Sequence, residues 1–385
     1  MKKGYQTVAI AALWMMVIQC STFANAQREA LRQLYVSNAT VATNIPSVRT
    51  YAEPPASFNV LAASDEELAL YGFPPRPDKQ AEPEHYTMWE RAMSAAKIRW
   101  HGDLKSIPSE NRERAVINQP GIAANDGVSP DVPTTPTSLN WSGVVLTKSM
   151  TKFGPKSFTD IYSTVTVPNG QKAFAGPCDQ YRQLAWIGLN GYAKFYAVQP
   201  GNGKSALIGG VWSQAICGGP DAAYLAVFGW EPAAIQGAFS VSPGDIFYAE
   251  VGAPAGGVNP SYLFIEDLTT LTYNAYSVSV PYGVTYVGNS AEWIVERWCC
   301  RNSGYPYPLL NTIAVNFDGG AALDGTGHTL YPGSSSTSTQ VMTMRDDNND
   351  QNIELIYQGT TGFEGQHALL LLTTGCAYAG GCVER

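Results

Sequence analysis

The stretch Ser290-Ala291-Glu292-Trp293-Ile294-Val295-Glu296 decides the fold class of this chain of 385 residues. It combines β-branched and aromatic residues without glycine or proline, which is typical of a strand. Because side chains alternate between the two faces of a strand, the two glutamates and Ile294 should share one face, and Trp293 and Val295 the other. The two carboxylates should stand about 13 Å apart. A face with two acids is either solvated or lines a cleft in which a carboxylate acts.

Short runs of the same kind recur from about Ser138 onward. Charged residues thin out there, and Val, Thr, Tyr, Gly and Ser dominate between turn signals. The runs lie at 161–167, 184–189, 195–198, 246–251, 262–266 and 273–280. Many short strands punctuated by Gly and Pro predict an all-β sandwich or barrel. About 250 residues fit one such domain, which we place at 138–385.

The chain begins like an exported protein. Two lysines are followed by an apolar run from Val8 to Ile18 and then by Ala24-Asn25-Ala26. A basic start, a short apolar run and a small-x-small cleavage site are typical of a signal peptide, here residues 1–26. The apolar run is too short to span a bilayer. We expect a soluble product in the periplasm or the medium, cleaved after Ala26.

Residues 27–137 differ from both neighbours. They are rich in Pro, Ala and charged residues, with a helix predicted at 88–100 and a Pro- and Gly-rich linker at 118–137. A signal peptide, a partly helical segment, a linker and a dense β domain form the layout of a zymogen. An ordinary N-terminal domain on a flexible tether is the alternative. As a propeptide, this segment would be the domain's own partner, either as an inhibitor or as a folding aid.

Cysteine usage agrees with export. If Cys20 leaves with the signal peptide, an even number remains, which suggests disulfides in an exported chain, although six cysteines allow 15 pairings. The six are Cys178, Cys217, Cys299, Cys300, Cys376 and Cys382. A zinc site is disfavoured because there is no CxxC pair and the second half holds only two histidines.

The charge balance limits the partners. Residues 138–385 hold 11 Lys and Arg against 18 Asp and Glu. This net negative charge argues against nucleic acid or an anionic membrane as a partner. Because few basic groups remain charged once the carboxylates protonate, repulsion in acid would be small. The composition is therefore compatible with work at low pH.

Motif searches leave paired carboxylates as the candidate chemistry. The chain has no GxSxG, HExxH, P-loop or dinucleotide fingerprint, and Asp324-Gly325-Thr326 has the wrong order for an aspartic protease. Glycosidases place two acids roughly 5–5.5 Å or 6.5–9.5 Å apart, closer than a straight strand allows here. Peptide hydrolysis needs one carboxylate as general base on water and a hydrogen-bond donor for the oxyanion.

Six blocks, in order, resemble the successive signatures of the glutamic peptidases, or eqolisins. They are Asn140–Gly143, Ala185–Gly191, Val198–Gly201, Val241–Asp245, Ile265–Thr270 and Ala291–Glu296. The resemblance implies a β-sandwich of two packed antiparallel sheets, of the jelly-roll or concanavalin-like kind, made as a secreted proenzyme that is active in acid. It implies polypeptide substrates and neither a metal nor a cofactor. We expect a monomer.

Carried over, the resemblance assigns two catalytic residues. Glu296 matches the catalytic glutamate, which would take a proton from water and later give it to the leaving amine. Gln199 matches the catalytic glutamine, whose amide N–H would stabilise the oxyanion. Trp186 matches a tryptophan that lines the cleft, and Asn190 shares its strand face, so both are candidate substrate-binding residues. Glu292 is either a supporting acid beside the substrate or a solvated one.

The sequence departs from the family at several positions. Asn190 stands where Asp is common, and Thr is common where Pro200 stands. Val227 and Gly229 replace a Trp and a Glu that shape the substrate cleft. We hypothesise that Glu231, which keeps the strand parity, substitutes for the missing glutamate in substrate binding. The family's propeptide is often basic, whereas residues 27–137 hold 11 basic against 14 acidic residues, which weakens an electrostatic block.

Two other functions stay open on the sequence. One is a carbohydrate-active sandwich, either a glycosidase or a lectin-like binder, with four tryptophans as sugar platforms: Trp141, Trp186, Trp230 and Trp293. The other is a family member that keeps the fold and has impaired activity because of Val227 and Gly229.

Overall fold

The computed structural model describes much of the chain in separate ranges. These are 30, 33–35, 40–108, 137–138, 140–148, 150, 152–171, 181–192, 205–216, 222–231, 233–298, 307, 309–312, 315–331, 338–344, 356–363 and 366–373. The predicted signal peptide, most of the linker, all six remaining cysteines and Gln199 lie outside these residues. Among the described residues, no helix is both long and apolar enough to cross a membrane.

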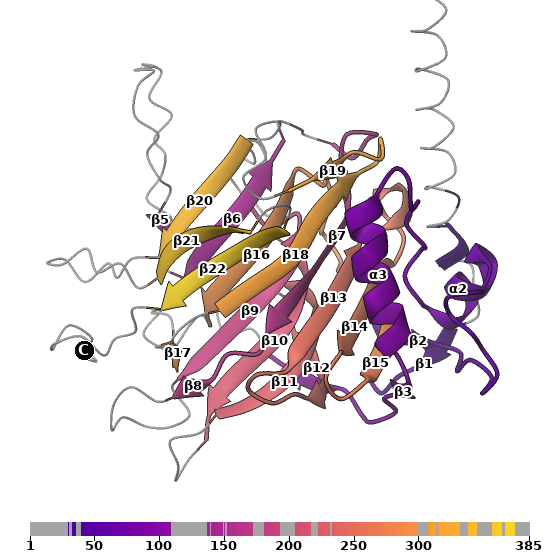
Figure 1. The fold of residues 1–385 in the computed structure, drawn as a ribbon, viewed down its shortest axis with the longest axis horizontal. Coiled ribbons are helices and arrows are strands. Elements are labelled where there is room, and N and C mark those ends of the chain that lie inside the picture. The colour runs from indigo at the N-terminus through magenta and orange to yellow at the C-terminus, as the bar shows by residue number, and fades with distance from the viewer. Residues whose placement is uncertain are drawn as a thin grey trace, which may run out of the picture.

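Two large and mostly antiparallel sheets dominate the described residues (Figure 1). The eleven-stranded sheet runs β1 (Thr40–Ala42), β2 (Val48–Tyr51), β15 (Thr272–Val278), β14 (Ser261–Asp267), β13 (Ile246–Gly252), β7 (Phe158–Thr166), β18 (Val315–Asp324), β22 (Gln366–Thr373) and β21 (Ile356–Phe363). Two short strands join it, β3 (Ile98–Arg99) beside β15 and β19 (Thr329–Leu330) beside β18.

The nine-stranded sheet packs against the first. Its order is β4 (Lys105–Ile107), β12 (Ile235–Ser240), β11 (Ala222–Glu231), β10 (Ala206–Ala215), β9 (Arg182–Leu189), β16 (Ser290–Arg297), β6 (Trp141–Thr147), β20 (Ser338–Met344) and β5 (Thr137–Ser138). A small pair, β8 (Gly170–Gln171) and β17 (Asn311–Thr312), forms a separate two-stranded sheet. The predicted antiparallel β-sandwich is confirmed. Five of the six expected runs fall on strands, and 195–198 lies outside the described residues.

The core between the sheets follows from strand alternation. Inward side chains from both sheets form one apolar cluster, which includes Val165 from β7, Ile187 from β9, and Trp293 and Val295 from β16. The alternate residues of β16 face away from this core, as the sequence predicted. Each large residue removed from water here contributes about 1.5–3 kcal/mol, so the face assignment of β16 is strongly fixed.

The helices come from the N-terminal part of the chain. The two longest are α2 (Asp65–Tyr71) and α3 (Pro83–Ala95), while a short 3-10 turn at Ala255–Gly257 lies between β13 and β14. The predicted helix at 88–100 is shifted, because α3 begins five residues earlier, with Pro83 in its first turn, and ends at Ala95. The residues after it are extended, since Ile98 pairs with Thr272 of β15 and its amide donates to the carbonyl of Leu271.

Candidate active site

The outer face of the nine-stranded sheet carries both glutamates of β16. Glu292, Ile294 and Glu296 point away from the inter-sheet core, and both carboxylates are fully buried. Aromatic and aliphatic side chains surround them, including Trp141 and Trp186. A carboxylate buried among such groups must receive hydrogen bonds or stay protonated.

Two side chains donate hydrogen bonds to Glu296. The indole Nε1 of Trp186 lies 2.9 Å from Oε2, and Nδ2 of Asn140 lies 3.3 Å from Oε1. Trp186 stands on β9, and Asn140 directly precedes β6, the two strands that pair with β16. The carboxylate is therefore fixed by donors from both neighbouring strands.

Glycines allow this arrangement. A Cβ on Gly188 would lie 2.7 Å from the Trp186 ring, so glycine leaves room for the ring to lie over β9. Gly143, with a φ of 151°, faces β16 so closely that a Cβ would overlap the carbonyl oxygen of Trp293. Trp141 meets the Trp186 ring edge-on at a centroid distance of 5.1 Å. The indole is thus held with its N–H toward Glu296.

Glu292 accepts hydrogen bonds from two backbone amides and from the Ser290 side chain. Its Oε1 accepts from the amide nitrogens of Gly191 at 2.9 Å and Tyr192 at 3.1 Å. Its Oε2 is buried and has no hydrogen-bond partner among the described residues. The two amides lie two and three residues after the end of β9 at Leu189. Glu292 therefore holds the backbone that immediately follows β9.

The environment of Glu292 favours its neutral form. Burial raises the pKa of Glu292 to about 7, against hydrogen bonds from Ser290, Gly191 and Tyr192 that lower it. The charge of Glu231 on β11 raises it further. The two predicted substrate-binding acids are thus electrostatic neighbours, and below neutral pH Glu292 carries a proton.

The chain matches one protein family over the sandwich. A family model described as the Peptidase A4 family covers residues 139–363, which is more than half of the chain. The chain belongs to the Peptidase A4 family. The predicted membership of the glutamic peptidases is confirmed, and the protein is a peptidase of this family. No curated protein matches the chain.

Solved structures of glutamic peptidases resemble this Peptidase A4 member in fold. Scytalido-glutamic peptidase with a transition state analog inhibitor is 20% identical, at a TM-score of 0.46, covering 61% of this chain and 98% of that chain. The Eqolisin-family SCP-B, with the tripeptide Ala-Ile-His, is 17% identical, with the same coverage and a TM-score of 0.44. Aspergilloglutamic peptidase from Aspergillus niger is 21% identical, with coverage of 50% and 99% and a TM-score of 0.40.

Asn190 ties three segments of this peptidase together. It is fully buried with a left-handed φ of 73°. Its Oδ1 accepts from the amides of Val287 and Gly288 at 2.8 and 2.9 Å, and its Nδ2 donates to the carbonyl of Ser205 at 3.2 Å. An aspartate could accept the first two bonds but could not donate the third. The contacts show that Asn190 holds the backbone at Val287, Gly288 and Ser205 in place. Substrate binding by Asn190 stays a prediction.

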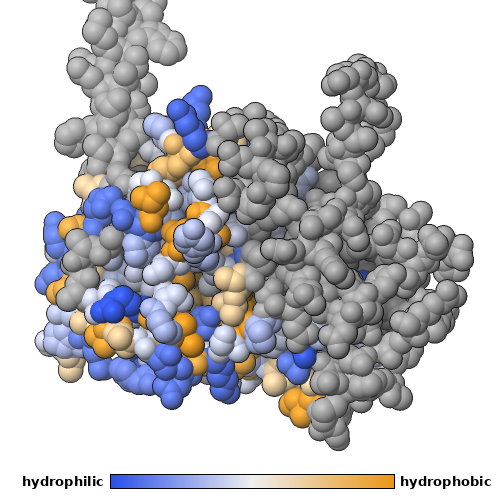
Figure 2. All heavy atoms as spheres, turned by 180° about the vertical axis from the view of Figure 1, so that it is seen from behind, coloured by the Kyte–Doolittle hydropathy of each residue, from blue (hydrophilic) through white to orange (hydrophobic). Residues whose placement is uncertain are grey.

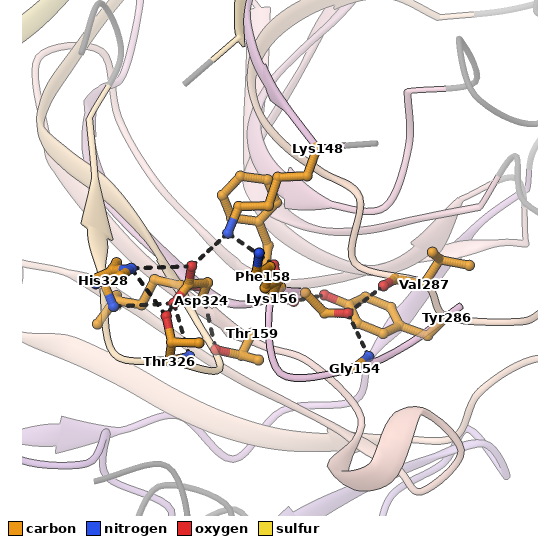
Figure 3. A network of polar contacts seen from close by, with 12 residues as sticks. Lys148, Gly154, Lys156, Phe158, Thr159, Tyr286, Val287, Asp324, Thr326 and His328 are labelled. Atoms are coloured by element: carbon orange, nitrogen blue, oxygen red, sulfur yellow. Dashed lines mark hydrogen bonds and ion pairs between the residues drawn. The ribbon is translucent and has the colours of Figure 1, made fainter. Parts of the chain in front are cut away.

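A second set of contacts clamps the loop that leads into β16 (Figure 3). Ser157 donates its hydroxyl to the carbonyl of Val287 at 2.7 Å, and the Tyr286 hydroxyl donates to the carbonyl of Phe158. Beside them, Lys148 Nζ lies 2.7 Å from an Asp324 oxygen. The strand that carries Glu296 therefore starts from a loop that side-chain hydrogen bonds hold in place.

The remaining predicted residues that the structure describes are buried. Glu231 is 6% exposed, and Gly229 has a φ of 141°, which disfavours a side chain there. The four candidate sugar platforms are between 0 and 5% exposed, and Trp230 and Trp293 lie in the inter-sheet core. These rings present almost no face for stacking a sugar.

Sequence reasoning missed one residue of the site. Asn140 was quoted only as the first residue of a family block, yet its amide binds the carboxylate of Glu296. No local sequence signal marks Asn140 as a donor to Glu296, because the pairing of β6 with β16 that brings the two residues together is a tertiary contact. Within the described ranges, no group of three His, Cys, Asp or Glu side chains could hold a metal ion.

Proposed function

We propose that this peptidase is a secreted acid endopeptidase in which Glu296 activates water and the amide of Gln199 stabilises the oxyanion. The observation that carries the proposal is the buried carboxylate of Glu296 with N–H donors on both oxygens. The donors hold the group in one orientation, so its remaining lone pairs face a fixed direction. A general base must be held in this way to take a proton from an attacking water.

The reaction needs no other ionisable group at the carbonyl. Glu296 would accept the proton of water as its oxygen attacks the scissile carbonyl carbon. The negative charge on the carbonyl oxygen would be met by the N–H of Gln199, which is outside the described residues. Glu296 would then pass its proton to the leaving amine, so that proton and charge balance over the cycle. This scheme requires neither metal nor cofactor.

The neighbouring residues support substrate and strand in this scheme. Trp186 would line the substrate cleft while donating to Glu296. Glu292 and Glu231 would bind the substrate, and Glu292 would be neutral in acid, since burial and the charge of Glu231 raise the pKa of Glu292 to about 7. We also propose that residues 1–26 act as a signal peptide that directs secretion.

The test is cleavage of an acid-unfolded protein between roughly pH 2 and 6. This window is chosen because a carboxylate base works best at a pH near its own pKa. The wild-type chain is compared with Glu296→Gln, Gln199→Ala and Glu90→Gln, an exposed glutamate on α3, with an aspartic-protease inhibitor and a chelator present. Cleavage that survives both additives and Glu90→Gln, and is lost in the first two variants, would support the mechanism. A folded, processed wild type without cleavage would overturn it and favour an impaired family member.

A further inference from the structure

The N-terminal segment, defined here as residues 40–108, is built into both sheets of the sandwich. Strand β2 pairs with β15 at one edge of the eleven-stranded sheet, and β4 pairs with β12 at one edge of the nine-stranded sheet. The family match begins only at residue 139, so these strands are additions to the matched domain. They occupy edges that would otherwise offer unpaired backbone groups.

The same segment joins the two edges. Asn44, between β1 and β2, donates through Nδ2 to the carbonyl of Leu104 at 2.9 Å and accepts from its amide at 3.0 Å. Leu104 and Val48 are members of the central core between the sheets. The N-terminal segment therefore closes one open side of the sandwich and contributes to its interior.

Helix α3 covers the outer face of the eleven-stranded sheet, as Figure 1 shows. Trp89, fully buried, packs with Met93 into a cluster that includes the outward tyrosines of the sheet. His85 stacks on Tyr162 with ring centroids 3.8 Å apart and planes 5° apart. Without α3 these aromatic residues would form an exposed apolar face, which is rare on a soluble protein.

Polar groups of the N-terminal segment also form hydrogen bonds with the sandwich. Arg99, 7% exposed, donates through Nε to Oδ1 of Asn274 on β15 at 3.2 Å. Its Nη1 donates to the carbonyl of Ala52 at 2.6 Å within the segment itself. Asn274 in turn donates to the carbonyl of Trp100 at 2.9 Å. Separating the two parts would leave buried donors and acceptors unpaired, which is costly.

The N-terminal segment lies away from the candidate active site. Its only strand in the nine-stranded sheet is β4, five strand positions from β16. At the usual spacing between strands, this places β4 about 24 Å from Glu296. Its helix α3 lies on the opposite side of the sandwich. Figure 2 shows the face of the molecule opposite to the one seen in Figure 1. Hydrophilic and hydrophobic residues are interspersed over the described part of that face.

We infer that residues 40–108 are a permanent part of the enzyme and stay bound as a non-covalent light chain if the chain is cut between residues 109 and 136. The surface that binds this light chain is the outer face of the eleven-stranded sheet together with the β15 and β12 edges. The segment stabilises the fold and does not inhibit the site. This inference goes beyond the proposed function and does not depend on it.

The first test cuts the intact protein. A recognition sequence for a site-specific protease is inserted between residues 109 and 136, and the chain is cleaved to completion at neutral pH and at pH 4. We expect both pieces to co-elute in gel filtration and to separate only in denaturant, with peptidase activity within about twofold of the uncut chain. Separation in native buffer, with residues 137–385 still folded, would overturn the inference, as would a severalfold rise in activity on removal of the N-terminal piece.

The second test needs no cleavage and no activity. Native-state hydrogen exchange of the intact chain compares the amides of α3 with those of β14. Equal protection, reached only by global unfolding, is expected for one cooperative unit, and early exchange of α3 alone would contradict it. In the cleaved protein, Trp89→Ala should lower the urea concentration that releases the light chain, whereas Glu90→Ala on the exposed side of α3 should not. Equal release from both variants would overturn the assigned contact surface.

Discussion

Both outer faces of the sandwich bury glutamates, and Glu296 on one face and Glu266 on the other differ in the hydrogen bonds they receive. On the nine-stranded sheet, Glu296 receives N–H bonds on both oxygens. On the eleven-stranded sheet, Glu266 is fully buried, and neither of its oxygens has a hydrogen-bond partner among the described residues. Burial raises the pKa of Glu266 well above its ordinary value, and Asp267 adds to the rise. Strand alternation alone places an acid outward, and the neighbouring donors decide whether it serves as a charged or a neutral group.

The largest expected difference between the faces is in activity. Glu296→Gln removes the proposed base and should lower kcat/KM by about a thousandfold, within the range for general-base catalysis. Glu266→Gln makes the same chemical change on the other face and should leave kcat/KM within about twofold. Steady-state kinetics on one peptide near the optimum pH measure both, with circular dichroism to confirm folding. Equal losses in the two variants would remove the functional distinction between the faces.

The second prediction concerns stability and Glu266. Because its folded-state pKa is raised, the folded protein holds this proton more tightly than the unfolded chain. The free energy of unfolding should therefore be greatest in acid and fall as pH rises from about 4.5 through the raised folded value. Glu266→Gln stays neutral and should remove this part of the fall, which urea unfolding at pH 4, 5.5 and 7.5 would measure. A variant with the wild-type slope would show that Glu266 is not held neutral.

Glu292 should show a smaller effect of the same sign. Its folded-state pKa is raised to about 7 from an ordinary value of 4.5. The corresponding loss of unfolding free energy between these pH values is on the order of 3 kcal/mol. Glu292→Gln should make the free energy of unfolding depend less on pH between these values. The glutamine keeps an oxygen that can accept from the amides of Gly191 and Tyr192. A steeper pH dependence in the variant would count against the assignment.

Particular residues show which features of the fold and site could be predicted from the sequence. The alternation of β16 was readable because a strand has a strict period of two, and Trp293 and Val295 do enter the core. The bounds of α3 could not be read from the sequence, because pairing of Ile98 with β15 overrides local helix propensity. The tertiary bond from Asn140 to Glu296 joins residues 156 positions apart, and no local pattern encodes it. The docking of residues 40–108 depends on shape complementarity, which composition does not report.

The smallest predicted effect probes one donor on the active face. Trp186→Phe keeps the ring over Gly188 but removes the N–H that Glu296 accepts. Losing a hydrogen bond to a charged group costs about 1.5–3 kcal/mol, which corresponds to roughly a tenfold to hundredfold loss in kcat/KM. Because that donor favours the carboxylate over the acid, the acid limb of the pH profile should move to higher pH. Trp293→Phe, on the same sheet but facing the core, should leave that limb in place. A profile that moves equally in both variants would mean that packing, rather than the indole N–H, governs the carboxylate.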